Sequence, residues 1–204
     1  MPSDTPKPLR ADAARNFEKI VRAAREVYAE RGPDAPLEEV ARRAGVGIAT
    51  LFRRFPDKGV LLRAVLDQQF AEQVAPAVDR ALEDEDPRRG LAAVMEAALS
   101  SAVNDYNALT AARNAGVLTA EVGDRFFDAL DPLVRRGQRA GVIRGDLVPE
   151  DVRRIMLMLV SVLWTMEPGE SGWRRYVTLV LDGLSPHAAS PLPHPAPAIR
   201  RPEH

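Results

Sequence analysis

Apolar residues recur at helical spacing along almost the whole chain, and this pattern restricts the fold more than any other feature of the sequence. From Phe17 to Tyr28 they follow the i, i+3, i+4, i+7 rule of one buried helical face. Similar spacing recurs over residues 88–105, 121–140, 149–166 and 170–185. The sequence has no alternating apolar run and no Asn-Gly hairpin turn, which are the marks of strands. We therefore predict an all-α fold.

Glycine, proline and aspartate divide this pattern into separate helices. Gly32 and Pro33 end the first helix, and Gly45 ends a short second one. Asp57 is placed to cap a later helix, whose apolar spacing predicts an unbroken run to about Glu83.

The amino-acid composition excludes most kinds of catalytic site from the first 186 residues. The sequence has no cysteine, and its three histidines, His187, His194 and His204, lie in the last eighteen residues. Thiol nucleophiles, Ser-His-Asp triads and Cys or His metal sites are therefore excluded from the first 186 residues. Carboxylates remain, but we expect the acidic run Glu83–Asp86 to be a solvated loop. The sequence predicts no enzyme, no metal and no cofactor.

Proline is concentrated near both ends of the chain. Residues 1–10 are expected to form a flexible arm. Residues 186–204 are expected to form a disordered tail, and deletion of residues 187–204 is expected to leave dimerisation intact. The chain start lacks the apolar run of a signal peptide, and the longest apolar stretch, Ile155–Trp164, is too short to span a bilayer. We expect a cytoplasmic protein with no membrane partner.

Charge is unevenly distributed along the sequence. Residues 1–63 hold 13 Lys and Arg against 9 Asp and Glu, a net charge of +4. Residues 64–204 hold 15 against 20, a net charge of −5. This asymmetry favours a nucleic-acid-binding face near the start of the chain, although an ordinary solvated surface is the alternative.

Residues 37–55 carry the pattern of a helix-turn-helix. Two short helical segments are joined by the tripeptide Gly45-Val46-Gly47, and glycine permits the sharp reversal that this motif needs. Val40, Val46 and Leu51 are expected to be buried together beneath the turn.

Such a unit exposes the helix over residues 48–54, with Ala49, Thr50, Arg53 and Arg54 facing outward. A short side chain and a hydroxyl suit base edges, and guanidinium groups suit phosphates or guanine. A plain αα-hairpin with a solvated basic surface is the alternative.

Lys58 immediately follows the capping Asp57, at the positive end of a helix dipole. A cation at that position costs about 0.3–1 kcal/mol. Its presence suggests that an anion, such as a DNA phosphate, is held against the helix start.

The stretch from Ala14 to Phe70 resembles the DNA-binding domain of the TetR/AcrR family of transcriptional regulators. The resemblance is carried by a long first helix ending in Arg-Gly, the helix-turn-helix, and an aromatic-x-x-Phe-Pro-x-Lys run. It implies an all-α homodimer that binds DNA and whose C-terminal part binds a small molecule. The implied domains are a helix-turn-helix domain over 11–57 and an effector-binding and dimerisation domain over 58–185.

The resemblance assigns the DNA contacts by position. The implied DNA-binding residues are Arg15, Gly47, Ala49, Thr50, Phe52, Arg53, Arg54 and Lys58. Three positions depart from the family pattern. Phe52 replaces a tyrosine and lacks its phosphate-binding hydroxyl, so a role in the core alone is the alternative. Gly47 replaces a serine cap, and Ala35-Pro36-Leu37 replaces a Thr or Ser at the second helix.

The effector pocket and the dimer contact are predicted from apolar residues beyond residue 70. The candidate pocket walls are Phe70, Val74, Leu99, Val103, Tyr106, Asn107, Phe126, Phe127, Leu130 and Leu159. They suit a small apolar or amphipathic effector. Helix 149–166 is apolar nearly all round between Ile155 and Trp164 and needs cover on every side, which a partner subunit would supply. Burial in the core of the monomer is the alternative. The candidate dimer residues are Ile155, Val162, Trp173, Val177, Val180, Leu181 and Leu184.

The sequence therefore predicts a ligand-responsive repressor that binds a palindromic operator in double-stranded DNA as a homodimer, associated with the nucleoid. Two alternatives belong to other classes. One is an all-α small-molecule carrier without DNA function, which the departures at Phe52 and Pro36 allow. The other is an enzyme that uses carboxylates alone.

Overall fold

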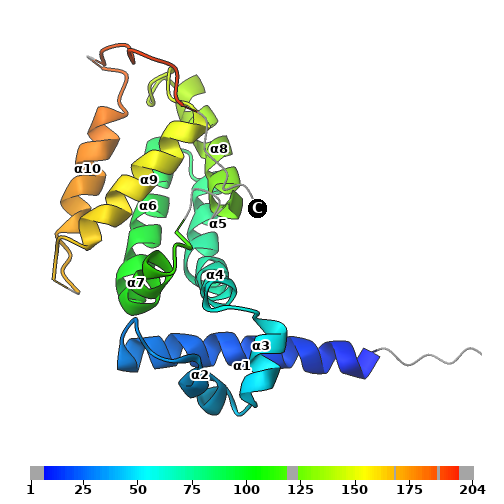
Figure 1. Cartoon of the computed structure of the whole chain (residues 1–204). Helices are drawn as coiled ribbons and strands as arrows, with labels where there is room; N and C mark the ends of the chain where they lie inside the picture. The colour runs from blue at the N-terminus through cyan, green and yellow to red at the C-terminus, as the bar shows by residue number, and fades with distance from the viewer. Residues whose placement is uncertain (1–6, 119–123, 168, 188, 198–204) are drawn as a thin grey trace, which may run out of the picture. The chain divides into compact units, whose positions relative to one another are not determined.

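The computed structural model describes residues 7–118, 124–167, 169–187 and 189–197, and every regular element within these ranges is helical (Figure 1). The all-α prediction is confirmed. The spatial contacts between residues group the chain into two compact units. The first unit is the chain up to Gln68 together with Asp105–Val117. The second unit is Gln69–Asn104 together with the chain from Leu118 onward.

The first unit is built around one long helix. Its elements are α1 (Lys7–Arg31), α2 (Leu37–Ala44), α3 (Ile48–Arg54), α4 (Lys58–Gln69, except its last residue) and α7 (Tyr106–Asn114). α1 packs against α2 and α7, and α2 packs against α3. The predicted stripe of α1 is fully buried at Ile20, Ala24 and Val27. α1 ends as predicted at Gly32, which has a φ of +83° and donates its N–H to Tyr28 O at 3.0 Å.

α7 is a helix that the sequence analysis did not predict. Asp105, with φ −112° and ψ 35°, leaves the helical conformation and separates it from the preceding helix. The Asp105 carboxylate accepts a hydrogen bond from Arg25 Nη2 of α1 at 3.0 Å. Asn107 Nδ2 also donates to Ala29 O at 3.4 Å. These bonds attach α7 to the first unit.

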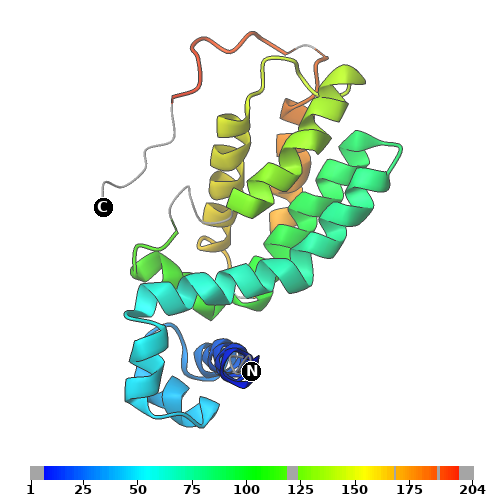
Figure 2. The ribbon, with the colours of Figure 1, turned by 90° about the vertical axis from the view of Figure 1, so that its right-hand side faces the viewer.

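The second unit is a helical bundle around α6. Its elements are the π-helical segment η1 (Phe70–Val74), α5 (Ala75–Glu83), α6 (Pro87–Asn104), α8 (Asp124–Arg139), α9 (Pro149–Leu163) and α10 (Trp173–Gly183). α6 contacts all of the others (Figures 1 and 2), and its Leu91, Val94 and Leu99 are fully buried. α5 and α6 approach closely because residue 90 is glycine: a Cβ there would lie 3.0 Å from Ala81 O. None of the described helices is both long and apolar enough to cross a membrane.

The predicted unbroken helix from Asp57 to Glu83 contains a π-helical turn. Ala75 N–H bonds to Phe70 O, five residues back, and the backbone on both sides stays helical. Pro76 explains the widening, because proline has no N–H and its ring collides with the carbonyl four residues earlier. The two units meet in sequence at Gln68 and Gln69, directly before this turn.

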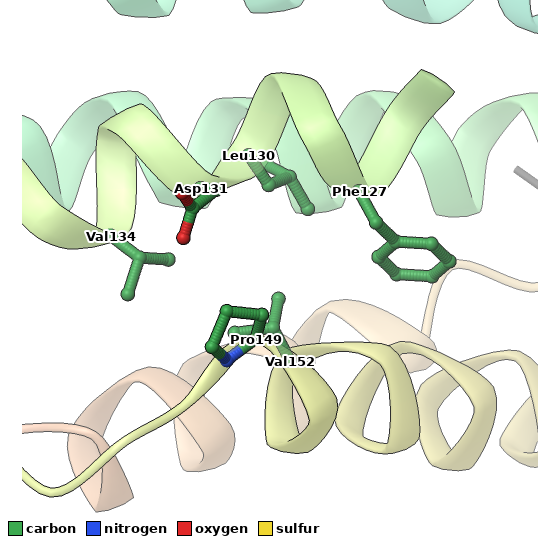
Figure 3. Close-up of a pocket in the computed structure, with 6 residues that line it drawn as sticks. All are labelled: Phe127, Leu130, Asp131, Val134, Pro149 and Val152. Carbon is green, nitrogen blue, oxygen red and sulfur yellow. The ribbon is translucent and has the colours of Figure 1, made fainter. Parts of the chain in front are cut away.

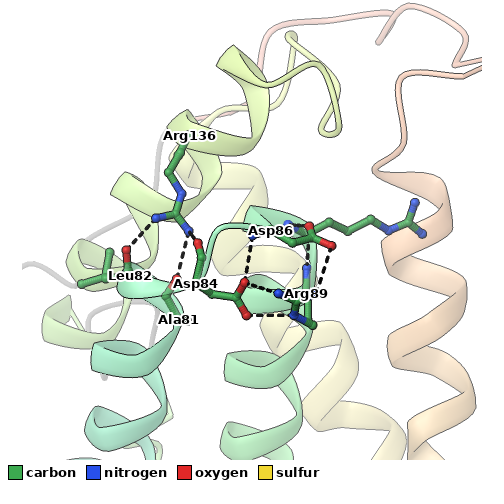
Figure 4. Close-up of polar contacts among 7 residues, drawn as sticks. Ala81, Leu82, Asp84, Asp86, Arg89 and Arg136 are labelled. Atoms are coloured by element: carbon green, nitrogen blue, oxygen red, sulfur yellow. Dashed lines mark hydrogen bonds and ion pairs between the residues drawn. The ribbon is translucent and has the colours of Figure 1, made fainter.

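The acidic run Glu83–Asp86 joins α5 to α6 and is more ordered than a solvated loop. The Arg136 guanidinium donates to the carbonyls of Ala81, Leu82 and Asp84, at 3.0, 2.6 and 2.6 Å (Figure 4). It thereby satisfies the carbonyls that the end of α5 leaves without helical partners. The sequence analysis did not predict this role of Arg136.

The carboxylates of the same loop cap the next helix. Asp86 Oδ1 accepts the N–H groups of Arg88 and Arg89, at 2.9 and 3.2 Å. Asp84 pairs with Arg89 through two hydrogen bonds (Figure 4), and these together with the Asp86 N–H hold the pKa of the Asp84 carboxyl below its usual range.

The two ends of the chain that were predicted to be flexible lie partly within the described residues. Residues 1–6 lie outside the described residues, and residues 7–10 already belong to α1. In the tail, residues 188 and 198–204 lie outside the described residues. Residues 189–197 are joined to the second unit by three hydrogen bonds, two donated by Arg144 and Arg154 and one accepted by Asp146. Side chains distant in sequence supply the partners that a proline-rich backbone cannot supply itself.

Candidate DNA-binding surface and effector pocket

The turn between α2 and α3 has the predicted geometry. Gly45 has a φ of +69° and a ψ of 32°, the left-handed conformation that glycine adopts without strain. Gly45 N–H bonds to Arg42 O and Val46 N–H bonds to Ala41 O, which closes the end of α2. The chain therefore reverses within the predicted tripeptide.

The inner side of the motif matches the prediction at two of three positions. Val40 and Leu51 are fully buried, and Phe55, one turn after Leu51, is buried with them. Val46 is only half-buried, which corrects the prediction, because it belongs to the turn and has helix on one side only.

Neither short helix has a side-chain cap. Pro36 precedes α2 and Gly47 precedes α3, both in extended conformation. Gly47 O accepts the N–H of Thr50 at 2.9 Å, so backbone alone starts α3.

The outer side of α3 carries most of the predicted DNA-binding residues. Gly47, Ala49, Arg53 and Arg54 are exposed, and Thr50 is half-buried. Arg15 of α1 is exposed as well. Phe52 is 44% exposed, which excludes a role in the core alone. It lies next to Leu51 along the helix, about 100° around the axis, and therefore faces water.

Ion pairs within the first unit occupy the arginines of α2. Arg43 bonds to Glu30 and Glu26 of α1, and these bonds hold the pKa of the Glu30 carboxyl below its usual range. Arg42 pairs with Glu39 at 2.7 Å. Arg53, by contrast, has no hydrogen bond or ion pair with any residue that the structure describes.

Arg54 is held by an aromatic stack. Its guanidinium lies 5.1 Å from the ring centroid of Phe17, and the rings of Phe17 and Phe55 lie 5.3 Å apart. This packing fixes Arg54 at the C-terminal end of α3.

Lys58 has partners within the first unit. Its Nζ donates to Pro33 O at 3.1 Å and lies 5.4 Å from the Tyr28 ring centroid. These contacts explain a cation at the start of α4 without a bound anion, although an ammonium group has further N–H donors for a phosphate. Asp57 caps α4 as predicted, since its Oδ1 accepts Val60 N–H at 2.8 Å.

The candidate pocket residues are divided between the two units. Tyr106 and Asn107 belong to α7 in the first unit, and the other eight belong to the second. Three of those eight form an aromatic cluster: the ring centroids of Phe70 and Phe126 lie 5.8 Å apart, and those of Phe126 and Phe127 lie 5.0 Å apart.

A hollow of about 220 Å³, partly open to solvent, lies between α8 and α9 (Figure 3). It is lined by Phe127, Leu130, Asp131, Val134, Pro149 and Val152. Only Phe127 and Leu130 were candidates from the sequence. The other α8 residues follow them at helical spacing, which is the signal that could have identified them.

Most candidate dimer residues are buried within the chain itself. Trp173, Val177, Leu181 and Leu184 are at most 9% exposed, whereas Ile155, Val162 and Val180 are half-buried. The apolar side chains that α9 and α10 leave in solvent are Met158, Tyr176 and Leu179, exposed by 62, 39 and 55%. None of these three was a candidate from the sequence.

Two family models match the chain. The model of bacterial regulatory proteins of the tetR family matches residues 20–65. The model of the C-terminal domain of SbtR-like transcriptional regulators matches residues 86–186. No protein among the curated ones matches the chain.

Solved structures resemble the chain over most of its length. The TetR transcriptional regulator SCO0520 from Streptomyces coelicolor is 30% identical with a TM-score of 0.56, covering 84% of this chain and 99% of that one. The TetR transcription regulatory protein from Mycobacterium vanbaalenii is 31% identical with a TM-score of 0.52, covering 87% and 99%. The regulator FadR from Bacillus subtilis, in complex with stearoyl-CoA, shares the fold at 19% identity with a TM-score of 0.61, covering 83% and 97%.

Proposed function

The chain belongs to the TetR family of bacterial transcriptional regulators, and from this premise we propose that it is a cytoplasmic repressor. It binds a palindromic operator as a homodimer, with one α3 in each of two successive major grooves. A small effector bound in the second unit weakens this binding.

The exposed Arg53 is the observation that carries the DNA-binding proposal. The arginines of α2 are occupied by acidic partners, whereas Arg53 faces solvent on the helix that the motif presents. Ala49 and Thr50, on the same helix, are the proposed base contacts, and the ring of Phe52 adds apolar surface. Further phosphate contacts are assigned to Arg15, Gly47 N–H, Arg54 and Lys58.

The dimer contact is assigned to the α9–α10 face, defined as Ile155, Met158, Val162, Tyr176, Leu179 and Val180. These six residues are exposed or half-buried apolar side chains of two helices that pack together. A two-fold axis through this face buries each side chain twice, once in each subunit. The α9–α10 face thereby replaces the buried residues Trp173, Val177, Leu181 and Leu184 as the proposed contact.

The effector site is assigned to the aromatic cluster of Phe70, Phe126 and Phe127 and the hollow beside it. Only about 10 Å³ of the hollow can hold the centre of a water-sized molecule, far less than the roughly 300–1,000 Å³ of typical ligand pockets. A ligand must therefore bind a more open arrangement of these helices, and such a preference for one conformation is what regulation requires. Apolar walls favour an apolar or amphipathic effector, and the stearoyl-CoA bound to FadR is amphipathic.

The chain passes between the two units three times, and two of these connections join described helices directly. One is the passage from α4 into η1, another is the junction of α6 with α7 at Asp105, and the third is the step from Val117 to Leu118. A change in α6 reaches α1 through the Asp105–Arg25 ion pair, whose side chains are only 11 and 23% exposed.

Reciprocal titration tests this proposal. Operator fragments are recovered from sheared genomic DNA, and an effector is found by thermal shift among apolar and amphipathic compounds. We expect the effector to lower operator affinity by roughly 5–150-fold and the operator to lower effector affinity by the same factor. Equal effector affinity with and without operator would show that the pocket does not control the DNA-binding surface.

A further inference from the structure

The C-terminal arm, defined as residues 189–197, keeps a fixed course although nearly all of its side chains are exposed. Four of these nine residues are proline, and Leu192 is 43% exposed. Proline lacks the N–H that regular structure needs, so the arm has no internal reason to be ordered. The order comes from the second unit.

Three hydrogen bonds join the bundle to backbone groups of the arm. Arg144 Nη2 donates to Ser190 O at 2.6 Å, and Arg154 Nη2 donates to Pro197 O at 2.6 Å. The Asp146 carboxylate accepts Leu192 N–H at 3.1 Å. These anchors position the arm and leave its side chains free for another partner.

The loop that anchors the arm, residues 140–148 between α8 and α9, is itself held by hydrogen bonds. Arg144 is 13% exposed and bonds to Asp146 at 2.6 and 2.9 Å. Gln138 Nε2 of α8 donates to the carbonyls of Arg144 and Leu147. The arm therefore rests on a rigid support between α8 and α9.

The arm ends at one border of the α9–α10 face. Arg154, which holds Pro197, lies four residues before Met158 and so on the same side of α9. Figure 2 shows the arm passing over the upper end of α9. The C-terminal end of the arm is therefore anchored one helical turn from Met158 of the α9–α10 face.

We propose that the C-terminal arm is part of the interface between two copies of this chain, with Leu192 packed against the partner subunit. The partner is a second copy because Arg154, which holds the end of the arm, lies one turn before Met158 of the proposed dimer contact, and because Leu192 remains 43% exposed. The inference rests on the proposed homodimer, and two-fold symmetry makes each arm contribute once per subunit. It replaces the expectation that the tail can be deleted without effect on dimerisation.

Sedimentation of the full chain and its variants over a range of concentrations tests this proposal. The arm variants are a chain that ends at His187 and the full chain with Leu192→Glu. The matched control is Leu82→Glu, a substitution of comparable exposure, 39%, on α5. We expect both arm variants to raise the dimer dissociation constant about tenfold or more, and the control to leave it unchanged.

A Met158→Glu variant separates the arm from the homodimer proposal. If Met158→Glu disrupts the dimer while both arm variants stay within twofold of the parent, the homodimer stands and the arm proposal is overturned. A tighter dimer after truncation overturns it too, because the arm would then shield its own α9. A parent chain that is monomeric at every concentration overturns both proposals.

Discussion

The two units place their candidate functional residues in opposite environments. In the first, the core is closed behind α3, and the candidate DNA-binding residues other than Thr50 and Lys58 are exposed. In the second, the candidate pocket walls include residues such as Leu99 and Leu130 that are almost fully buried. A surface site on a short motif is encoded by local spacing, whereas a site inside a bundle depends on how several helices face one another.

The largest expected effect is a loss of folding stability at a buried position of α10, which contrasts with an exposed position on the α9–α10 face. Val177 is 1% exposed and Leu179 is 55% exposed, two positions apart on α10. We expect Val177→Glu to destabilise the folded chain by about 4 kcal/mol or more, because it buries an unpaired charge. Leu179→Glu should leave the monomer within about 0.5 kcal/mol of its stability and weaken the dimer. Thermal unfolding and sedimentation measure the two effects, and equal stability losses would contradict the distinction.

Removal of the Arg136 guanidinium is expected to cause the next largest loss of folding stability, because this group joins α8 to the end of α5. Arg136→Ala should lower the free energy of unfolding by about 2–3 kcal/mol, because three carbonyls at the end of α5 lose their donor. The matched control is the neighbouring Arg135, which is 63% exposed and, among the described residues, paired only with Asp131, with an expected loss below about 0.5 kcal/mol. Urea unfolding compares the two, and losses of similar size would remove Arg136 from the support of α5.

The first unit is tested at Arg53. Arg53→Ala should weaken operator binding by about 1–3 kcal/mol. It should also reduce the slope of log affinity against log salt concentration by about 0.9 for each lost phosphate contact, and a dimer loses two such contacts. Arg42→Ala is the control, because Arg42 is held by Glu39. Unchanged affinity and slope for Arg53→Ala would place the DNA contact elsewhere. A changed sequence preference at constant slope would mean that Arg53 contacts a base.

Tyr28 gives the smallest expected effect, and one that depends on pH. Its hydroxyl is buried with no hydrogen-bond partner among the described residues, and burial raises the pKa of Tyr28 to about 12. The folded chain therefore favours the neutral phenol, a contribution present below pH 10 and lost between about pH 10 and 12. Tyr28→Phe should be neutral or stabilising by up to about 1 kcal/mol at pH 8 and should lack this alkaline loss. Urea unfolding at pH 8 and pH 11 checks both, and a clear loss at pH 8 would indicate a partner for the hydroxyl.

The fold class and the helix-turn-helix could be predicted because their signals are local. The period of 3.6 residues identifies α1, and Gly45 marks a turn that few other residues permit. α7 was missed because a single non-helical residue, Asp105, separates it from α6. One non-helical residue leaves the spacing of the apolar side chains almost unchanged, so the sequence pattern does not show where α6 ends. Arg136 was missed because its three carbonyl partners lie 52–55 residues away in sequence.

The division of α10 into a buried and an exposed side could not be predicted either. Val177, Leu179 and Val180 are all apolar, and spacing alone does not show which of them faces α6 and α9. The order in residues 189–197 likewise depends on Arg144, Asp146 and Arg154, whose positions follow from the packing of α8 against α9. Such contacts between distant segments are outside the reach of local pattern.

Selection of DNA from a random pool by the purified full-length protein tests the central claim most directly, which is that two copies of α3 read one operator. We expect enrichment of a palindrome whose half-site centres lie about 34–36 Å apart along the DNA helix axis, or a multiple of that distance. Arg53→Ala, folded and dimeric, should lose or change this enrichment. Recovery of no preferred sequence by the folded parent protein, or the same palindrome with equal enrichment by Arg53→Ala, would contradict the claim.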